Sequence, residues 1–96
     1  MGGALCITHA AFHVSQDQPA RFGFIVSKAV GNAVTRNLVR RRLKHIVDQR
    51  LQQGFRGADV VFRALPASGS AGFAELNAEV NRSLDRVEQL RAKAGR

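Results

Sequence analysis

The feature that most restricts the fold is a helical stretch, residues 33–53, set between segments whose composition favours β-strands. Its apolar residues recur at spacings of three and four: Val39, Leu43, Ile46, Val47 and Leu51. Residues at those spacings share one face of a helix. Asn32 is suited to cap the N-terminus of this helix, and Gly54 is suited to end it. The segment therefore predicts an amphipathic helix whose apolar stripe packs on other parts of the chain.

Three segments rich in β-branched and aromatic residues predict strands: residues 4–14, 21–27 and 59–65. In the second segment, Phe22, Phe24 and Val26 fall on one face by the two-residue period of a strand, so we expect that face to be buried. Pro66 ends the third strand, because proline cannot donate a hydrogen bond to a ladder.

A second helix is predicted over residues 73–93, after a loop at residues 67–72. Its apolar residues again recur at helical spacing: Leu76, Val80, Leu84 and Val87. The order strand, strand, helix, strand, helix is typical of an α+β fold, here a two-layer split β-α-β sandwich with the helices on one side of one sheet. We expect a single domain over residues 1–96, with residues 4–93 as its ordered core.

The charge of the chain points to a polyanion as partner. Fifteen Lys and Arg against seven Asp and Glu give a net charge of +8. Residues 21–50 hold eight of these bases and a single acid, Asp48, so nearly all of the excess lies in one central segment. The lone Cys6 excludes an internal disulfide and fits a reducing cytoplasm. The longest apolar run, residues 4–7, is too short to cross a membrane.

A row of polar and cationic residues lies beside the apolar stripe of the first helix: Arg36, Asn37, Arg40, Arg41 and Lys44. Like charges at positions i and i+4 lie about 5–6 Å apart and repel one another, so such a row becomes favourable when phosphates neutralise it. Arginine also makes bidentate contacts with phosphate. Two interpretations remain open, an RNA-binding surface and an ordinary solvated face.

Residues 21–44, RFGFIVSKAVGNAVTRNLVRRRLK, closely resemble the signature of the bacterial ribonuclease P protein subunit. That signature is a strand ending in V-S-K, a turn with glycine, and then A-V-x-R-N-x-x-[KR]-R-x-x-[KR] on a helix. Residues 59–66 and the helix that begins at Phe73 are similar to the last strand and helix of the family. The resemblance covers residues 4 to about 92, and its A-V-x-R-N block is far more specific than a generic basic helix.

This resemblance implies a ribonucleoprotein endonuclease, a hydrolase that removes the 5′ leader from precursor tRNA. In that family the RNA subunit holds the catalytic Mg²⁺ and cleaves the phosphodiester, so we expect neither catalytic residues nor metal ligands in this chain. The expected partners are ribonuclease P RNA, with one protein per RNA, and precursor tRNA, in the cytoplasm and with no membrane. The crossover between parallel strands is expected to be left-handed, against the general rule. The alternative is a structural RNA-binding protein of the ribosomal type.

The resemblance also implies site residues by position. The expected RNA-binding set is Lys28, Asn32, Arg36, Asn37, Arg40, Arg41 and Lys44. The candidate residues of the cleft that holds the leader are His9, Ile25 and Ser27. On a regular strand His9 and His13 share a face, and Phe12 lies on the opposite face, where we expect it in the core. Two histidines are too few ligands for a metal site.

Three features depart from the family pattern. Ala29 and Leu38 stand where the family usually has bases, and Leu38 lies outside the apolar stripe, so we expect it exposed on the RNA side. Family members usually begin with a basic amphipathic helix and a short strand, whereas Met1 here directly precedes the first long strand. We therefore expect the N-terminal helix to be absent, part of the core uncovered and the leader cleft without one wall.

His45 and Asp48, three residues apart, are expected to form a surface pair.

Overall fold

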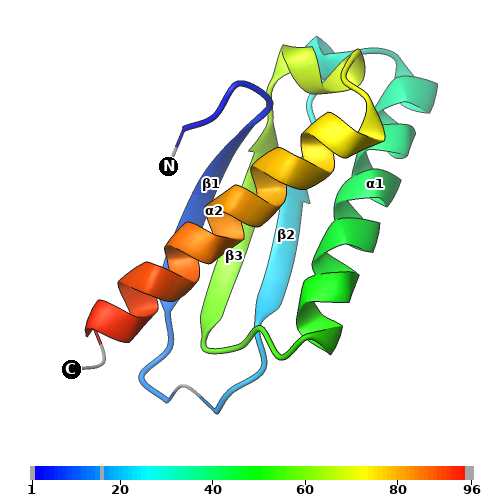
Figure 1. Cartoon of the computed structure of the whole chain (residues 1–96). Helices are drawn as coiled ribbons and strands as arrows, with labels where there is room; N and C mark the ends of the chain where they lie inside the picture. Colours follow the sequence, from blue (N-terminus) through cyan, green and yellow to red (C-terminus); the bar gives the residue numbers. More distant parts are fainter. Residues whose placement is uncertain (1, 16, 95–96) are drawn as a thin grey trace.

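The computed structural model describes residues 2–15 and 17–94 as a sheet with two helices against one of its faces (Figure 1). The elements in chain order are β1 (Cys6–Phe12), β2 (Arg21–Ile25), the 3-10 turn η1 (Lys28–Val30), α1 (Ala33–Gln52), β3 (Ala58–Ala64), the 3-10 turn η2 (Pro66–Gly69) and α2 (Phe73–Ala94). The predicted element order and the α+β class are confirmed. The loop predicted at residues 67–72 is partly wrong, because Pro66 opens η2, where its fixed φ suits the first turn of a helix.

The strands of the sheet have the order β1-β3-β2, with β3 in the middle. β1 runs antiparallel to β3, and β2 runs parallel to it. Parallel neighbours need a crossover connection, which α1 provides. Figure 1 looks onto the face of the sheet that α2 covers. From this side the chain leaves β2, passes through α1 in front of the sheet and returns in β3, which lies to the left of β2. The crossover is therefore left-handed, as the resemblance implies and opposite to the usual hand.

The core lies between the sheet and both helices. Val60 and Phe62 of β3 are fully buried, and the Phe62 ring stacks on Phe22 and Phe24 of β2, with 6.3 Å between centroids in each pair. The predicted helical stripes are buried as expected, apart from Leu51: Val39, Leu43, Ile46, Val47, Leu76, Val80, Leu84 and Val87. Burying one such side chain contributes about 1.5–3 kcal/mol, so these stripes hold the two layers together.

Two apolar residues that the sequence places in the core are exposed. Leu51 is 37% exposed and Phe12 is 41% exposed. Leu51 is next to the last residue of α1, and Phe12 is the last residue of β1. Both predictions are wrong, and both residues lie at the end of their element.

Arg50 takes an inward position in the last turn of α1, with only 12% of its side chain exposed. Its guanidinium donates to Asp85 of α2 at 2.7 Å and to Glu88 of α2 at 2.9 Å. These bonds join the two helices at the end where the apolar stripe of α1 has stopped.

Glu79 of α2 is buried and fixes the edge strand β1 to the helix layer. Its carboxylate accepts hydrogen bonds from the backbone N–H of Leu5 at 2.9 Å and from that of Cys6 at 2.7 Å. Over residues 2–5 the chain enters β1 without a preceding helix, and Gly2 bridges to Ile7. Of the helices in the described part of the chain, none is both long and apolar enough to span a membrane.

Candidate nucleic-acid interface

The two short 3-10 turns pack on each other and place the N-terminus of α1. Asn32 caps the helix as predicted, because its Oδ1 accepts a hydrogen bond from the backbone N–H of Thr35 at 2.9 Å. Gly69 of η2 lies against η1, where a Cβ would come within 2.3 Å of the carbonyl oxygen of Val30. Only glycine permits this approach. At the other end of α1, Gly54 adopts φ +97°, which agrees with the predicted stop.

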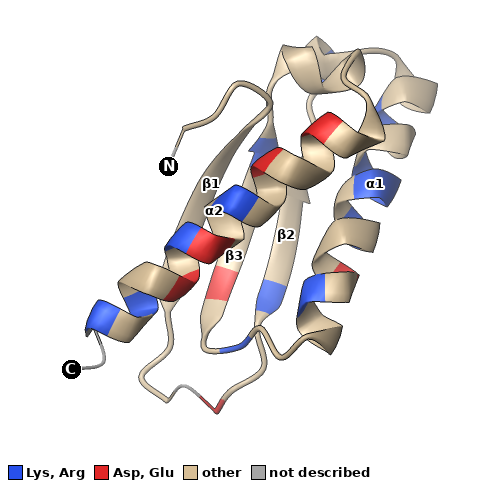
Figure 2. Cartoon of the chain, viewed as in Figure 1, with Lys and Arg blue, Asp and Glu red and all other residues tan. Residues whose placement is uncertain are grey.

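The solvent side of α1 carries what we call the arginine band: Arg36, Asn37, Arg40, Arg41 and Lys44. Figure 2 shows Lys and Arg along most of α1, where acids are rare. The Arg40 guanidinium donates to Asn37 Oδ1 at 3.4 Å and to the carbonyl oxygen of Val26 at 3.3 Å, which holds it beside β2. Lys44 lies 3.5 Å from Asp48, the one ion pair of the band within the residues described. The band is therefore a positive surface that the chain itself hardly neutralises.

Two members of the band have hydrogen-bonding capacity to spare. Arg36 is half-buried, and its Nε is buried without a hydrogen-bond partner in the described part of the protein. Arg41 is exposed to solvent. Lys28, also exposed, lies in η1 just before the start of α1 and adds a cation at that end. The structure thus brings the predicted RNA-binding residues together on one helix and the turn that precedes it.

One face of α1 differs from the prediction. Leu38 is half-buried, so the expectation that it is exposed on the RNA side is wrong. One turn further on, Arg42 points away from the band and donates to the carbonyl oxygen of Ala71 at 3.0 Å. The predicted surface pair of His45 is also wrong, because its ring packs against Phe73, with 5.8 Å between centroids. This side of α1 meets the start of α2, a contact that spacing within α1 cannot reveal.

The sheet face opposite the helices carries the candidate residues for the leader. The strand registers give two rows on this face: Ile7, Arg63 and Ile25, then His9, Val61 and Gly23. His9 and Ile25 are exposed on this common surface, and Ser27 is exposed just after the end of β2. Arg63 is also exposed here. Sequence reasoning missed Arg63, although strand alternation from the buried Phe62 would have placed it on this face.

A pair of titratable groups, His13 and Asp59, lies at one end of the same face. Nε2 of His13 lies 2.8 Å from Oδ1 of Asp59, and the His13 side chain is 13% exposed. This hydrogen bond is the main cause that holds the pKa of Asp59 below its usual value. The prediction that His9 and His13 share a face is confirmed, because the register places His9 and Asp59 on this face and the His13 ring contacts Asp59. In residues 2–15 and 17–94, no three His, Cys, Asp or Glu side chains gather closely enough to hold a metal ion.

Comparison with known proteins gives the same family name at every level. A family model described as "Ribonuclease P" matches residues 5–88. The ribonuclease P protein component of Arthrobacter sp. (strain FB24) is 50% identical over 72 residues, which are 75% of this chain and 53% of that protein. That of Streptomyces bikiniensis is 51% identical over 69 residues, 72% of this chain and 56% of that protein. The chain thus spans little more than half the length of these relatives.

Solved structures agree on the fold. The RNase P protein of Staphylococcus aureus has a TM-score of 0.78 and 17% sequence identity, with 91% of this chain and 78% of that chain covered. The RNase P protein of Thermotoga maritima has a TM-score of 0.77 and 17% identity, with 90% and 80% covered. At these identities the likeness establishes the arrangement of strands and helices.

Proposed function

Because this chain belongs to the ribonuclease P protein family, we propose that it is the RNA-binding protein subunit of ribonuclease P and assists removal of the 5′ leader from precursor tRNA. The observation that carries the proposal is the arginine band, four cations on one helix with a single carboxylate, Asp48, beside them. Ribonuclease P RNA would supply the phosphates that neutralise this surface, with one protein per RNA, in the cytoplasm.

The charge of the interface sets how binding responds to salt. Each phosphate contact releases counterions and contributes about 0.7–0.9 to the slope of log affinity against log salt. Contacts from Lys28 and the four cations of the arginine band therefore give a slope of about −3.5 to −4.5. Between about 50 and 200 mM salt, the affinity for RNA would fall by about 10²- to 10³-fold.

The open face of the sheet would receive the leader. His9 and Ile25 lie exposed on it, and Gly23 leaves a flat place beside Val61. A base stacked on the His9 ring would gain about 1–3 kcal/mol. Arg63, in the same row as Ile25, would face the leader backbone as a cation. These contacts raise substrate affinity without reading a particular base.

Mg²⁺ belongs to this proposal as an ion held by the RNA subunit and the substrate, where it supplies the chemistry of phosphodiester cleavage. The contribution of this chain would be to bind both RNAs close together and to lower the repulsion between their backbones. That role needs guanidinium and imidazole groups placed on rigid elements, which α1 and the sheet provide.

Reconstitution tests the proposal. The chain is added to ribonuclease P RNA at low Mg²⁺, and removal of the 5′ leader from a precursor tRNA is followed. We expect strong stimulation of cleavage, which Arg36→Ala and Arg40→Ala reduce by at least tenfold. Lys93→Gln, a change of an exposed cation at the far end of α2, serves as the control and keeps the stimulation. Tight, salt-dependent RNA binding without any stimulation would instead indicate a structural RNA-binding protein of the ribosomal type.

A further inference from the structure

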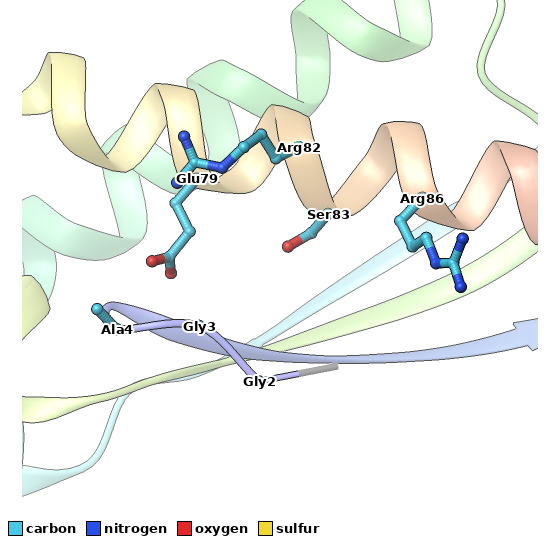
Figure 3. Close-up of a pocket in the computed structure, with 7 residues that line it drawn as sticks. All are labelled: Gly2, Gly3, Ala4, Glu79, Arg82, Ser83 and Arg86. Carbon is cyan, nitrogen blue, oxygen red and sulfur yellow. The ribbon is translucent and has the colours of Figure 1, made fainter.

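A groove runs between α2 and the chain just before β1, away from the arginine band. Figure 3 shows it, with Gly2, Gly3 and Ala4 on one side and side chains of α2 on the other. Its volume is about 470 Å³, and Arg82, Ser83 and Arg86 contribute to its lining. None of its lining residues is aromatic. The groove thus has two guanidinium groups and the carboxylate of Glu79 on its helix side.

The two arginines of this groove have no carboxylate partner in the described part of the chain. Arg82 and Arg86 are exposed and one turn apart, so they repel each other on an isolated helix. The acids within one turn are already engaged. Glu79 accepts hydrogen bonds from the start of β1, and Asp85 and Glu88 each accept one from Arg50. The positive charge at the groove is therefore available to a ligand from outside.

The shape of the groove favours an approaching backbone. Gly3 lies so close to Glu79 that a Cβ would come within 2.7 Å of its carboxyl carbon. The backbone at this position therefore borders the groove without a side chain. A Cβ on Gly2 would meet nothing within 4 Å, so that position is open. Ser83, which is half-buried, offers a hydroxyl donor between the two arginines. Arginine forks and hydroxyls match phosphate oxygens, and the groove has no aromatic ring on which a base could stack.

We propose that this groove is a second RNA-contact site, at which Arg82 and Arg86 bind backbone phosphates of the same folded RNA that the arginine band binds. The proposal rests on the proposed function, because it assumes a large folded RNA as partner. Contacts at the groove are independent of base sequence, and they act from α2 while the band acts from α1. One RNA is thus held by two separate surfaces of a small protein.

The test removes both charges and measures binding of ribonuclease P RNA, without precursor tRNA, by fluorescence anisotropy over a series of salt concentrations. Each lost phosphate contact lowers the steepness of the salt dependence by about 0.7–0.9. For the double variant Arg82→Gln/Arg86→Gln we expect a decrease of about 1.4–1.8, which over the range from about 1 M to about 0.1 M salt weakens the affinity by about 25- to 60-fold. Both side chains are exposed, so we expect the thermal midpoint of the variant to stay close to that of the parent.

The matched control is Arg91→Gln/Lys93→Gln, which removes the same charge from the same helix outside the groove. Arg91 donates to the carbonyl oxygen of Arg56, and Lys93 is exposed. We expect this variant to keep the slope of the parent and its affinity within about threefold. An unchanged slope in Arg82→Gln/Arg86→Gln, or an equal loss in the control, would overturn the proposal and leave the proposed function intact. A parent chain that fails to bind the RNA would overturn both.

Discussion

The buried carboxylate of Glu79 is the contact whose removal the structure predicts most sharply. It lies on α2, 8% exposed, and accepts hydrogen bonds from two consecutive backbone N–H groups, those of Leu5 and Cys6. Glu79→Ala removes the acceptor that both N–H groups share, so the start of the edge strand loses its hydrogen bonds to α2.

The magnitude follows from the bonds that are lost. Hydrogen bonds to a charged group contribute about 1.5–3 kcal/mol each, and the two donors share one carboxylate, so we expect a loss of about 3 kcal/mol in the free energy of unfolding. For a domain of this size 1 kcal/mol corresponds to about 4–8 °C in the thermal midpoint. The midpoint of Glu79→Ala should therefore fall by about 12–24 °C. Glu79→Gln keeps an oxygen acceptor and should lose roughly half as much.

Thermal unfolding followed by circular dichroism, together with urea titration, measures the effect. The matched control is Glu75→Gln, because Glu75 lies one turn earlier on the same helix and is exposed. We expect this control to change stability by less than about 1 kcal/mol, the value of an exposed hydrogen bond. If Glu79→Ala unfolded within about 0.5 kcal/mol of the parent, the carboxylate would not anchor β1, and this reasoning would be refuted.

Three further outcomes follow from contacts of Arg50, Asp59 and Cys6. Arg50→Gln should lower the free energy of unfolding by about 2 kcal/mol in urea titrations, because Asp85 and Glu88 lose their shared cation; an unchanged midpoint would contradict this. The hydrogen bond from His13 lowers the pKa of Asp59, so the stability that Asp59 contributes is complete above the pKa of an unfolded aspartate, about 3.9, and is lost as the pH falls through the lower folded value. An NMR titration should find the lowered pKa of Asp59 in the parent and a pKa closer to the ordinary value in His13→Ala, where Arg21 still lowers it. Burial, and then the charge of Glu79, raise the pKa of Cys6 to about 12, so its thiol should react with a disulfide reagent at pH 8 only when the chain unfolds; fast reaction of the folded protein would argue against this environment.

The spacing of apolar residues within single segments was enough to predict most of the fold. The stripe from Val39 to Val47 and the alternation of Phe22 and Phe24 each depend on neighbours a few residues away, so the local sequence determines which face is buried. The helical spacing of residues 36–44 also placed the arginine band correctly beside this stripe. Such patterns fail where an element ends, as Leu51 and Phe12 show.

Contacts between distant segments could not be found in this way. Glu79 bonds to residues more than 70 positions earlier, and His13 to an aspartate 46 positions away, so no local pattern reports either pair. The His45 ring packs against Phe73 at the start of α2, and the half-burial of Leu38 likewise does not follow from its position on α1. The left-handed crossover runs against the general rule for such connections, and it came only from the resemblance to a family.

In the proposed function, one side of α1 binds RNA, and the charge of the helix in general does not. Arg40 and Arg42 are two residues apart, and each donates a hydrogen bond to a backbone carbonyl, but Arg40 belongs to the arginine band while Arg42 turns toward α2. The decisive measurement is the salt dependence of ribonuclease P RNA binding for Arg40→Gln and Arg42→Gln. We predict that Arg40→Gln lowers the steepness by about 0.7–0.9 and that Arg42→Gln leaves it unchanged. Equal losses in the two variants would contradict the claim.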